Sequence, residues 1–329
     1  MTNVVIARLM VREIKYEMVP TRDGFGHGLV EMGKVNKDVV VLSADLTDST
    51  RANWFKKEFP ERFFGMGVAE QDMIGAAAGF ALMGKIPFAC TFGVFASGRA
   101  WDQIRVSVAY MNLNVKIIGT HGGISVGPDG ATHQALEEIS LMRILPNMTV
   151  IVPCDALEAK KATIEAANHK GPVYIRLGRS GAPVITKERD LFEINKASVI
   201  KDGKDVAIFA CGQMVYESLV ACEILSSDGI DARLINMHTP NPIDKDCRMK
   251  AAEETGAIVT AEEHTIAGGL GSAISEVLVE KCPVPIKFVG IRDKFGLSGE
   301  PEELFEHFGL KAKNIVRAAK EAIAMKRKA

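Results

Sequence analysis

The residue with the clearest chemical potential in this chain is Glu70, in the segment Gly65-Met-Gly-Val-Ala-Glu-Gln71. It opens a helix of small side chains from Asp72 to Met83. Gly75 and Gly79 predict a close helix–helix contact, since an isolated glycine costs a helix up to about 1 kcal/mol relative to alanine. A carboxyl group beside such a dry contact can be held protonated near neutral pH and can share its proton with a ligand. The alternative is a glutamate that only complements the helix dipole.

Two aromatic residues end a predicted strand in the stretch Thr91-Phe-Gly-Val-Phe95. Phe92 and Phe95 lie three residues apart, beside a glycine. Ligands bind at the carboxyl ends of parallel strands, so the pair could form a stacking platform for a flat heterocycle. Burial of both rings in the core is the alternative.

A glycine-rich loop, His121–His133, follows the next predicted strand. It carries four glycines and three polar groups of catalytic type, which are His121, Asp129 and His133. Such a loop is costly to order and is rarely only a connector. We therefore expect these groups to hydrogen-bond a polyhydroxylated substrate. The spacing lacks the pattern of metal ligands, so no metal site is predicted.

Two arginines and a serine lie at the ends of predicted elements. Arg22 precedes a helix, Arg179 follows the strand Tyr174–Leu177, and Ser49 closes the turn after Ser43. Arginine binds phosphate bidentately, so this set indicates a phosphate site. A surface ion pair is the alternative for each arginine alone.

Short apolar runs alternate with helical patterns along the whole chain. The predicted strands are Val39–Ala44, Pro87–Thr91, Val115–Gly119, Thr149–Pro153 and Val173–Arg176, then Val206–Cys211, Ala232–Asn236, Ala257–Thr260 and Ile286–Gly290. The predicted helices are Phe25–Asn36, Ala69–Met83, Ser97–Tyr110, Gln134–Leu145, Ala156–Asn168 and Ala312–Met325. The fold class is therefore α/β, with two three-layer domains and mainly parallel sheets. A charged linker at Thr186–Asp205 predicts domains at residues 1–190 and 191–329.

Composition excludes several classes of partner. The net charge of −1 offers no basic excess for nucleic acid. Lys85 interrupts the longest apolar run, so no membrane span is expected. The six cysteines are widely spaced, and the segment Met1–Pro20 lacks the apolar core of a signal peptide, so we expect a cytoplasmic protein. The segment Gly268–Ile274 fails the dinucleotide pattern and predicts a tight strand-to-helix turn.

Together these segments resemble the C-terminal half of transketolase, a pyrimidine-binding domain followed by a C-terminal α/β domain. The matching motifs are Ser43-Ala-Asp-Leu46, Gly67-Val-Ala-Glu-Gln71, Thr91-Phe92 with Phe95, Ala100-Trp-Asp-Gln-Ile-Arg105, Gly127-Pro-Asp-Gly-Ala-Thr-His133, and Glu262-Glu-His264 with Gly268-Gly-Leu-Gly271. The Gly-Asp-Gly motif with which the family grips the cofactor's diphosphate does not occur. The chain therefore resembles the separate C-terminal subunit of a split transketolase, whose N-terminal subunit would hold the diphosphate and Mg²⁺ or another divalent ion.

The resemblance implies a role for each candidate residue. Glu70 would hydrogen-bond the aminopyrimidine of thiamine diphosphate and thereby activate the cofactor, and His121 would be a second catalytic group. The other implied cofactor contacts are Asp45, Phe92 and Phe95. The implied substrate contacts are Asp129 and His121 at the sugar hydroxyls, and Arg22, Ser49, His133 and Arg179 at the terminal phosphate. The implied activity is transfer of a two-carbon ketol unit between sugar phosphates, as in the pentose phosphate pathway.

The resemblance also implies an assembly. Two copies would pair through the small-residue helix of the pyrimidine domain, and two N-terminal subunits would complete a heterotetramer. The beta subunit of a 2-oxo acid dehydrogenase is the nearest alternative, but it needs no phosphate-binding set. Deoxyxylulose phosphate synthase normally carries both halves in one chain. A noncatalytic assembly subunit is the alternative from another class, and the intact Glu70 argues against it.

Overall fold

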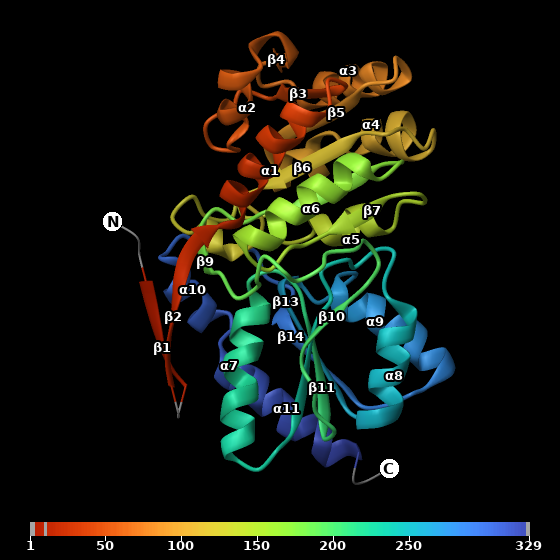
Figure 1. Ribbon diagram of the computed structural model, residues 1–329. Coiled ribbons are helices and arrows are strands. Elements are labelled where there is room, and N and C mark those ends of the chain that lie inside the picture. Colours follow the sequence, from red (N-terminus) through yellow and green to blue (C-terminus); the bar gives the residue numbers. More distant parts are fainter. Residues whose placement is uncertain (1–3, 10–11, 327–329) are drawn as a thin grey trace.

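The protein folds into two stacked α/β units, shown in a computed structural model that describes residues 4–9 and 12–326 (Figure 1). The first unit, red to green in Figure 1, carries a six-stranded parallel sheet in the order β4-β3-β5-β6-β8-β7. Its strands are β3 Val39–Ser43, β4 Phe63–Gly65, β5 Ile86–Phe92, β6 Lys116–Thr120, β7 Thr149–Ile151 and β8 Val173–Arg176. All five residues of β3 are buried, as expected for apolar strands covered on both faces.

Helices cover both faces of this sheet. One face packs against α1 Thr21–Val35, α2 Ala52–Glu58 and α6 Ala156–Asn168. The other packs against α3 Glu70–Leu82, the turns η2 Phe95–Arg99, α4 Trp101–Gln103 and η3 Ile104–Ala109, and α5 Glu138–Arg143. Two short turns, η1 Pro60–Arg62 and η4 Ile124–Val126, complete the unit.

The second unit, teal to blue, carries a five-stranded sheet in the order β10-β12-β11-β13-β14, in which only β10 is antiparallel. Its strands are β10 Ser198–Lys201, β11 Val206–Ala210, β12 Ala232–Asn236, β13 Ile258–Thr265 and β14 Ile286–Ile291. Its helices are α7 Met214–Ser227, α8 Lys245–Thr255, α9 Leu270–Lys281, α10 Pro301–His307 and α11 Ala312–Lys326. One apolar cluster includes residues of both units, so the core crosses the boundary between them.

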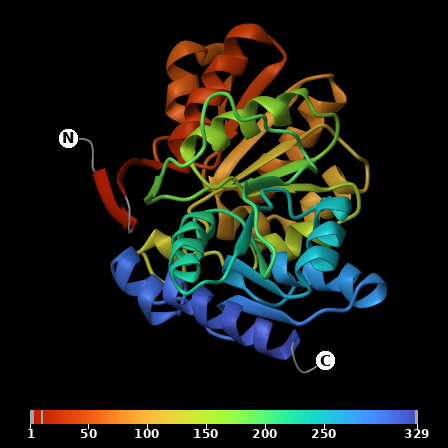
Figure 2. The ribbon, with the colours of Figure 1, turned by 60° about the horizontal axis from the view of Figure 1, so that its bottom comes forward.

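A small antiparallel sheet joins the ends of the first unit. It is formed by β1 Val4–Leu9, β2 Arg12–Pro20 and β9 Gly181–Pro183. The β1–β2 hairpin extends beside α7 of the second unit (Figures 1 and 2), where Tyr16 meets Tyr216 edge to face at 5.7 Å. The sequence patterns did not predict this hairpin.

The α/β prediction with mainly parallel sheets is confirmed. One predicted helix was wrong at its start, and two other predicted segments differ from the structure in detail. The helix expected over Gln134–Leu145 is only α5, because the Gln134 amide instead donates to the carbonyls of Ile124, Gly127 and Leu297. The helix expected over Ser97–Tyr110 begins at Phe95 and winds mostly as π turns. The expected linker Thr186–Asp205 contains β10, whose mixed polar pattern suits an edge strand.

The face of α3 with the small residues is open in the single chain. Gly75 and Gly79 are exposed, and a side chain added at either would meet nothing within 4 Å. The apolar side chains of Val68, Leu82 and Met83 are exposed beside them. The close helix contact predicted from the sequence is therefore absent within the described part of the chain, which leaves this face free for another molecule.

Candidate active site

Glu70 lies at the first position of α3 and is almost completely buried, with 1% of its surface exposed. Its two carboxylate oxygens lie 3.0 and 2.9 Å from Nη1 of Arg99, which belongs to η2. The sequence predicted the burial of Glu70, but it gave no sign of this cationic partner.

Arg99 connects Glu70 to the aromatic pair. Its guanidinium lies 4.4 Å from the centre of the Phe95 ring. Phe95 stacks on Phe92 with an angle of 16° between the rings, at a centroid distance of 6.1 Å. Phe92 is buried and Phe95 is half-buried, so the platform faces outward at Phe95. The π turns of η2 produce this placement, and such turns are frequent at functional sites.

His121 continues the row of rings. Its imidazole stacks on Phe92 at 3.8 Å, and its Nδ1 lies 2.9 Å from the Thr120 hydroxyl. Its Nε2 lies 3.4 Å from Nη1 of Arg22. Burial, and next the charge of Arg22, lower the pKa of His121 to about 3, so the ring is neutral at physiological pH. His133 meets Phe95 edge to face at 5.5 Å.

The end of the row beyond His121 is cationic. Arg22 donates to the carbonyl of Ser49 at 2.9 Å and has no ion pair among the residues that the structure describes. Burial, then the nearby charge of Arg51, lower the pKa of Arg22 to about 10, and Arg179 acts in the same direction. Arg22 therefore stays charged at neutral pH, in a place where further positive charges surround it.

Arg179 and Asp129 fix the glycine-rich loop beside these cations. Arg179 donates to the carbonyl of Val126 at 2.7 Å and pairs with Asp129 at 3.1 Å. The second unit holds the same loop, because the Glu263 carboxylate accepts from the backbone N–H of Ser125 at 2.6 Å. The two units together thus set the shape of the substrate loop.

A further charged network lies buried at the junction of the units. Arg176 pairs with Glu138 at 2.6 Å and donates to the backbone carbonyl of Glu263 at 2.8 Å. Burial raises the pKa of Glu138 and Glu263, while Arg176 opposes the shift. Glu262 caps α9 by accepting from the N–H groups of Leu270 and Gly271, which confirms the tight strand-to-helix turn.

Most residues proposed from the sequence thus form one continuous row. It runs from Glu70 through Arg99 and the three stacked rings to Arg22 and Ser49. The charge of Arg179, which pairs with Asp129, acts on Arg22 at this end. Asp45 is exposed in the loop after β3, with a left-handed backbone at φ 60°. Arg99 and Arg51 were missed. Arg51 could have been suspected because it stands two residues after Ser49 in the same loop.

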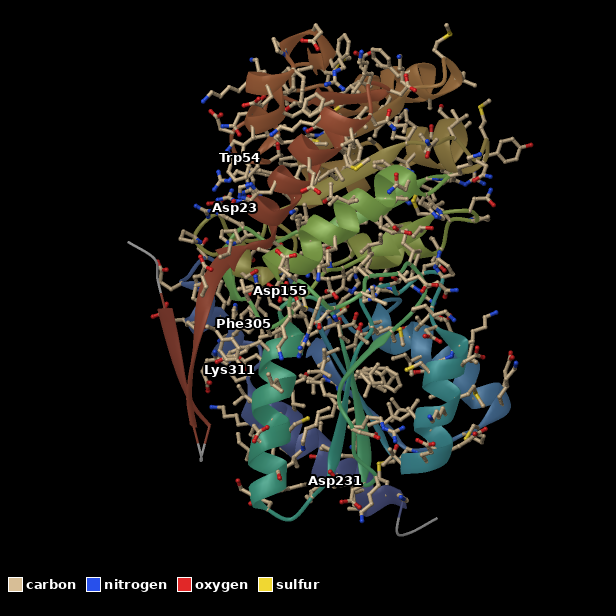
Figure 3. The ribbon with its side chains drawn as sticks, in the orientation of Figure 1. Asp23, Trp54, Asp155, Asp231, Phe305 and Lys311 are labelled. Carbon is tan, nitrogen blue, oxygen red and sulfur yellow. The ribbon has the colours of Figure 1, made fainter. Side chains whose placement is uncertain are left out.

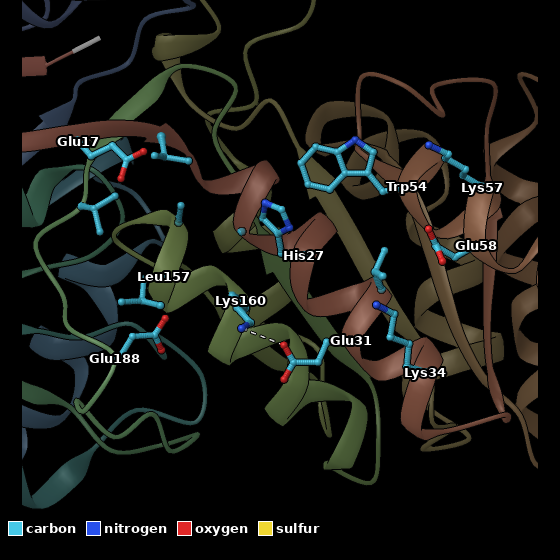
Figure 4. Close-up of a pocket in the computed structure, with 15 residues that line it drawn as sticks. Glu17, His27, Glu31, Lys34, Trp54, Lys57, Glu58, Leu157, Lys160 and Glu188 are labelled. Atoms are coloured by element: carbon cyan, nitrogen blue, oxygen red, sulfur yellow. Dashed lines mark ion pairs between the residues drawn. The ribbon is translucent and has the colours of Figure 1, made fainter. Parts of the chain in front are cut away.

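A wide pocket of about 770 Å³ lies elsewhere, between β2, α1, α2 and α6 (Figure 4). Its walls carry His27, Trp54 and an ion pair of Lys160 with Glu31 at 2.9 Å. None of the residues proposed for the site lines it. Its acidic and basic groups are mixed, so its walls favour no particular ligand charge.

Comparison with known proteins identifies the family. Residues 17–184 match the model of the transketolase pyrimidine binding domain, and residues 195–315 match that of the transketolase C-terminal domain. The chain belongs to the transketolase family. It is 46% identical to the 6-deoxy-6-sulfo-D-fructose transketolase subunit of Clostridium sp. (strain MSTE9), over 95% of this chain and 98% of that one.

Two further transketolase relatives match the chain along almost its whole length. An apulose-4-phosphate transketolase subunit of Phocaeicola vulgatus is 38% identical over 93% of this chain and 98% of that one. The solved structure described as a split gene transketolase, inactive beta4 tetramer, is 49% identical with a TM-score of 0.88, and it covers 94% of this chain and 100% of that one. The resemblance to the C-terminal half of transketolase is confirmed.

The side chains around Glu70 fit a flat nitrogen heterocycle. The Arg99 guanidinium is a planar group with N–H donors, and it lies over the Phe95 ring and forms an ion pair with Glu70. The space that it fills therefore suits another flat group with N–H donors, such as an aminopyrimidine ring. No group of three or more His, Cys, Asp or Glu residues within 4–9 and 12–326 could hold a metal ion. In the same ranges, no helix has the length and apolarity needed to cross a bilayer.

Proposed function

We propose that this transketolase chain is the C-terminal subunit of a split, thiamine-diphosphate-dependent enzyme that transfers a two-carbon ketol unit. The observation that carries the proposal is the continuous row from a buried carboxylate, through stacked rings, to a cluster of arginines. A carboxylate and rings suit the pyrimidine of the cofactor. Arginines suit the anionic end of a sugar substrate. A 2-oxo acid dehydrogenase subunit would not need this arginine cluster, because it has no sugar phosphate to bind.

At the cofactor end, Glu70 would hold the pyrimidine and exchange a proton with its ring nitrogen. Phe95 and Phe92 would orient the ring and exclude water on one side. Thiamine diphosphate, when bound, supplies a carbon that takes up and releases the ketol unit. Arg99 now occupies both contacts that the ring would need, so it must move away before the cofactor reaches Glu70.

At the substrate end, the contacts change one assignment made from the sequence. His121 touches Arg22, so we assign it to the anionic tail of the sugar with Arg22, Ser49 and Arg179. His133, edge-on to Phe95, then lies nearer the reacting carbons, where it and Asp129 would contact hydroxyl groups. Asp45 remains a proposed cofactor contact.

The substrate is a ketose whose end away from the reacting carbons is anionic. The relatives' names specify a sulfonated fructose and a 4-phosphate sugar. Guanidinium groups bind either anion through the same charged hydrogen bonds. We place Mg²⁺ or another divalent ion on the N-terminal subunit, and we propose self-association through α3 to give a heterotetramer. The six free cysteines suit a cytoplasmic enzyme.

The proposal is tested by purifying this chain with an N-terminal subunit and measuring ketol transfer from ketoses with and without a phosphate. The complex should transfer, while this chain alone should not bind thiamine diphosphate tightly. Arg179→Ala removes a charge-assisted hydrogen bond of about 1.5–3 kcal/mol, so kcat/KM for the phosphorylated ketose should fall by roughly 10- to 150-fold. Arg317→Ala, an exposed arginine on α11, is the charge-matched control. An equal loss with the unphosphorylated ketose, or tight cofactor binding by this chain alone, would refute the proposal.

A further inference from the structure

Arg51 occupies an unusual backbone position between Ser49 and the start of α2. Its φ of 68° and ψ of 10° are left-handed, a conformation that non-glycine residues rarely adopt. Such strain is retained where the surroundings impose it, often at functional sites. Asp45 and His121, two other residues of the site loops, are also left-handed. The loop thus holds the Arg51 side chain in one defined direction.

Three contacts hold that side chain at the edge of the site. Nε donates to Asp23 at 2.6 Å, Nη1 donates to the carbonyl of Asp48 at 3.1 Å, and the guanidinium lies 5.8 Å from the Trp54 ring centre. Asp23 and Trp54 lie on the same side of the first unit, near the start of α1 (Figure 3). Because Asp23 directly follows Arg22, the ion pair of Asp23 with Arg51 links the loop that carries Ser49 to Arg22.

Three arginines gather at this end, and two of them have a carboxylate partner among the described residues. Arg22, Arg51 and Arg179 bring three positive charges, and Asp23 and Asp129 supply the two carboxylates that pair with them. Neither of these carboxylates forms an ion pair with Arg22. In addition to burial, the charge of Arg51 lowers the pKa of both Arg22 and His121. Arg22 thus has no carboxylate partner among the described residues, at the place where the proposed substrate carries its anion. Arg51 keeps about a quarter of its side chain exposed, so it can still reach a ligand.

We propose that Arg51 is a specificity-determining residue, a third guanidinium that binds the anionic tail of the substrate, with Asp23 restraining it. This inference rests on the proposed function of the arginine cluster as the anion site. It predicts that Asp23 lowers anion affinity by holding Arg51 back, whereas a merely structural Arg51 would serve only to neutralise Asp23.

A double-mutant cycle separates these two roles. Arg51→Ala, Asp23→Asn and the double variant are each assembled with the N-terminal subunit. Binding of inorganic phosphate is measured by calorimetry, and kcat/KM is measured for a phosphorylated and an unphosphorylated ketose. Arg51→Ala should weaken phosphate binding about tenfold, at the lower end of the range for charged hydrogen bonds. Asp23→Asn should strengthen it, and the double variant should remain weaker than the wild type. The unphosphorylated ketose should be affected by less than about twofold.

The inference is overturned if the double variant regains wild-type phosphate affinity, because Arg51 would then only neutralise Asp23. It is also overturned if Arg51→Ala lowers kcat/KM equally for both ketoses. Failure of the underlying function gives a different result, since the wild-type complex would then show no preference for the phosphorylated ketose and Arg22→Ala would leave phosphate binding unchanged.

Discussion

Replacing Gly75 and Gly79 together by leucine should separate the folding of this chain from its self-association. Both glycines lie on the exposed face of α3, and an added side chain meets nothing within 4 Å. The single chain should therefore fold normally. Leucine is a better helix former than glycine, by somewhat under 1 kcal/mol per position, so α3 itself should become more stable.

The pairing of two copies through α3 should instead be lost. Forcing extra methylene groups into a close contact costs typically about 1–3 kcal/mol per site. In a two-fold pair each substitution occurs twice, so Gly75→Leu with Gly79→Leu adds four such sites, or roughly 4–12 kcal/mol. A micromolar dimer is held by only about 8 kcal/mol. The variant should therefore be largely monomeric at micromolar concentration.

Sedimentation velocity and calorimetric melts measure the two effects on the same samples. Ser226→Leu, at an exposed position of α7, controls for an added apolar side chain away from the proposed interface. If the double variant sediments as the wild-type oligomer, α3 is not the interface. If the double variant fails to fold, the two glycines are needed within the single chain and not only for its self-association.

Two further predictions concern single side chains. Burial raises the pKa of Glu158 from 4.5 to about 7, so the folded chain holds a proton that the unfolded chain has released between these values. The free energy of unfolding should then fall by roughly 3 kcal/mol as the pH rises through that window. Glu158→Gln should remove this slope in urea titrations, because glutamine does not titrate, and an unchanged slope would contradict the assignment. Arg99→Met should tighten the binding of thiamine diphosphate to the assembled complex by about 1 kcal/mol, or roughly fivefold, as measured by calorimetry. The reason is that the partly exposed ion pair of Arg99 with Glu70 no longer has to break before the cofactor binds. Weaker binding would show that Arg99 helps to hold the cofactor.

The sequence predicted the elements whose local signals agree with their packing. Strand β8 and helix α6 have the bounds that the sequence predicted. In the structure α6 begins after the N-cap residue Asp155, whose carboxylate accepts from the N–H of Glu158 at 2.8 Å. Figure 3 places Asp155 at the junction of the units. The helix expected from Gln134 failed because tertiary contacts of its amide outweighed the local helical pattern.

The candidate site residues also divide into those with a local sequence signal and those without one. Glu70, Phe92 and His121 were found because their types and neighbours are distinctive along the chain. Arg99 and Arg51 were missed because their roles depend on contacts with residues 29 and 28 positions away. A charged residue in a loop gives no local sign of which carboxylate it will meet.

The central claim is that Glu70 activates the cofactor, and exchange of the cofactor's C2 proton in the assembled complex tests it most directly. Glu70→Gln keeps the size of the side chain and one acceptor, but it cannot take up or release the proton. Asp72→Asn, at an exposed position of the same helical turn, is the isosteric control and should exchange normally. Our account predicts that Glu70→Gln assembles with the N-terminal subunit but exchanges this proton with deuterium slower by orders of magnitude, before any sugar is added. Near-normal exchange in that variant would mean that another residue activates the cofactor and would contradict the account.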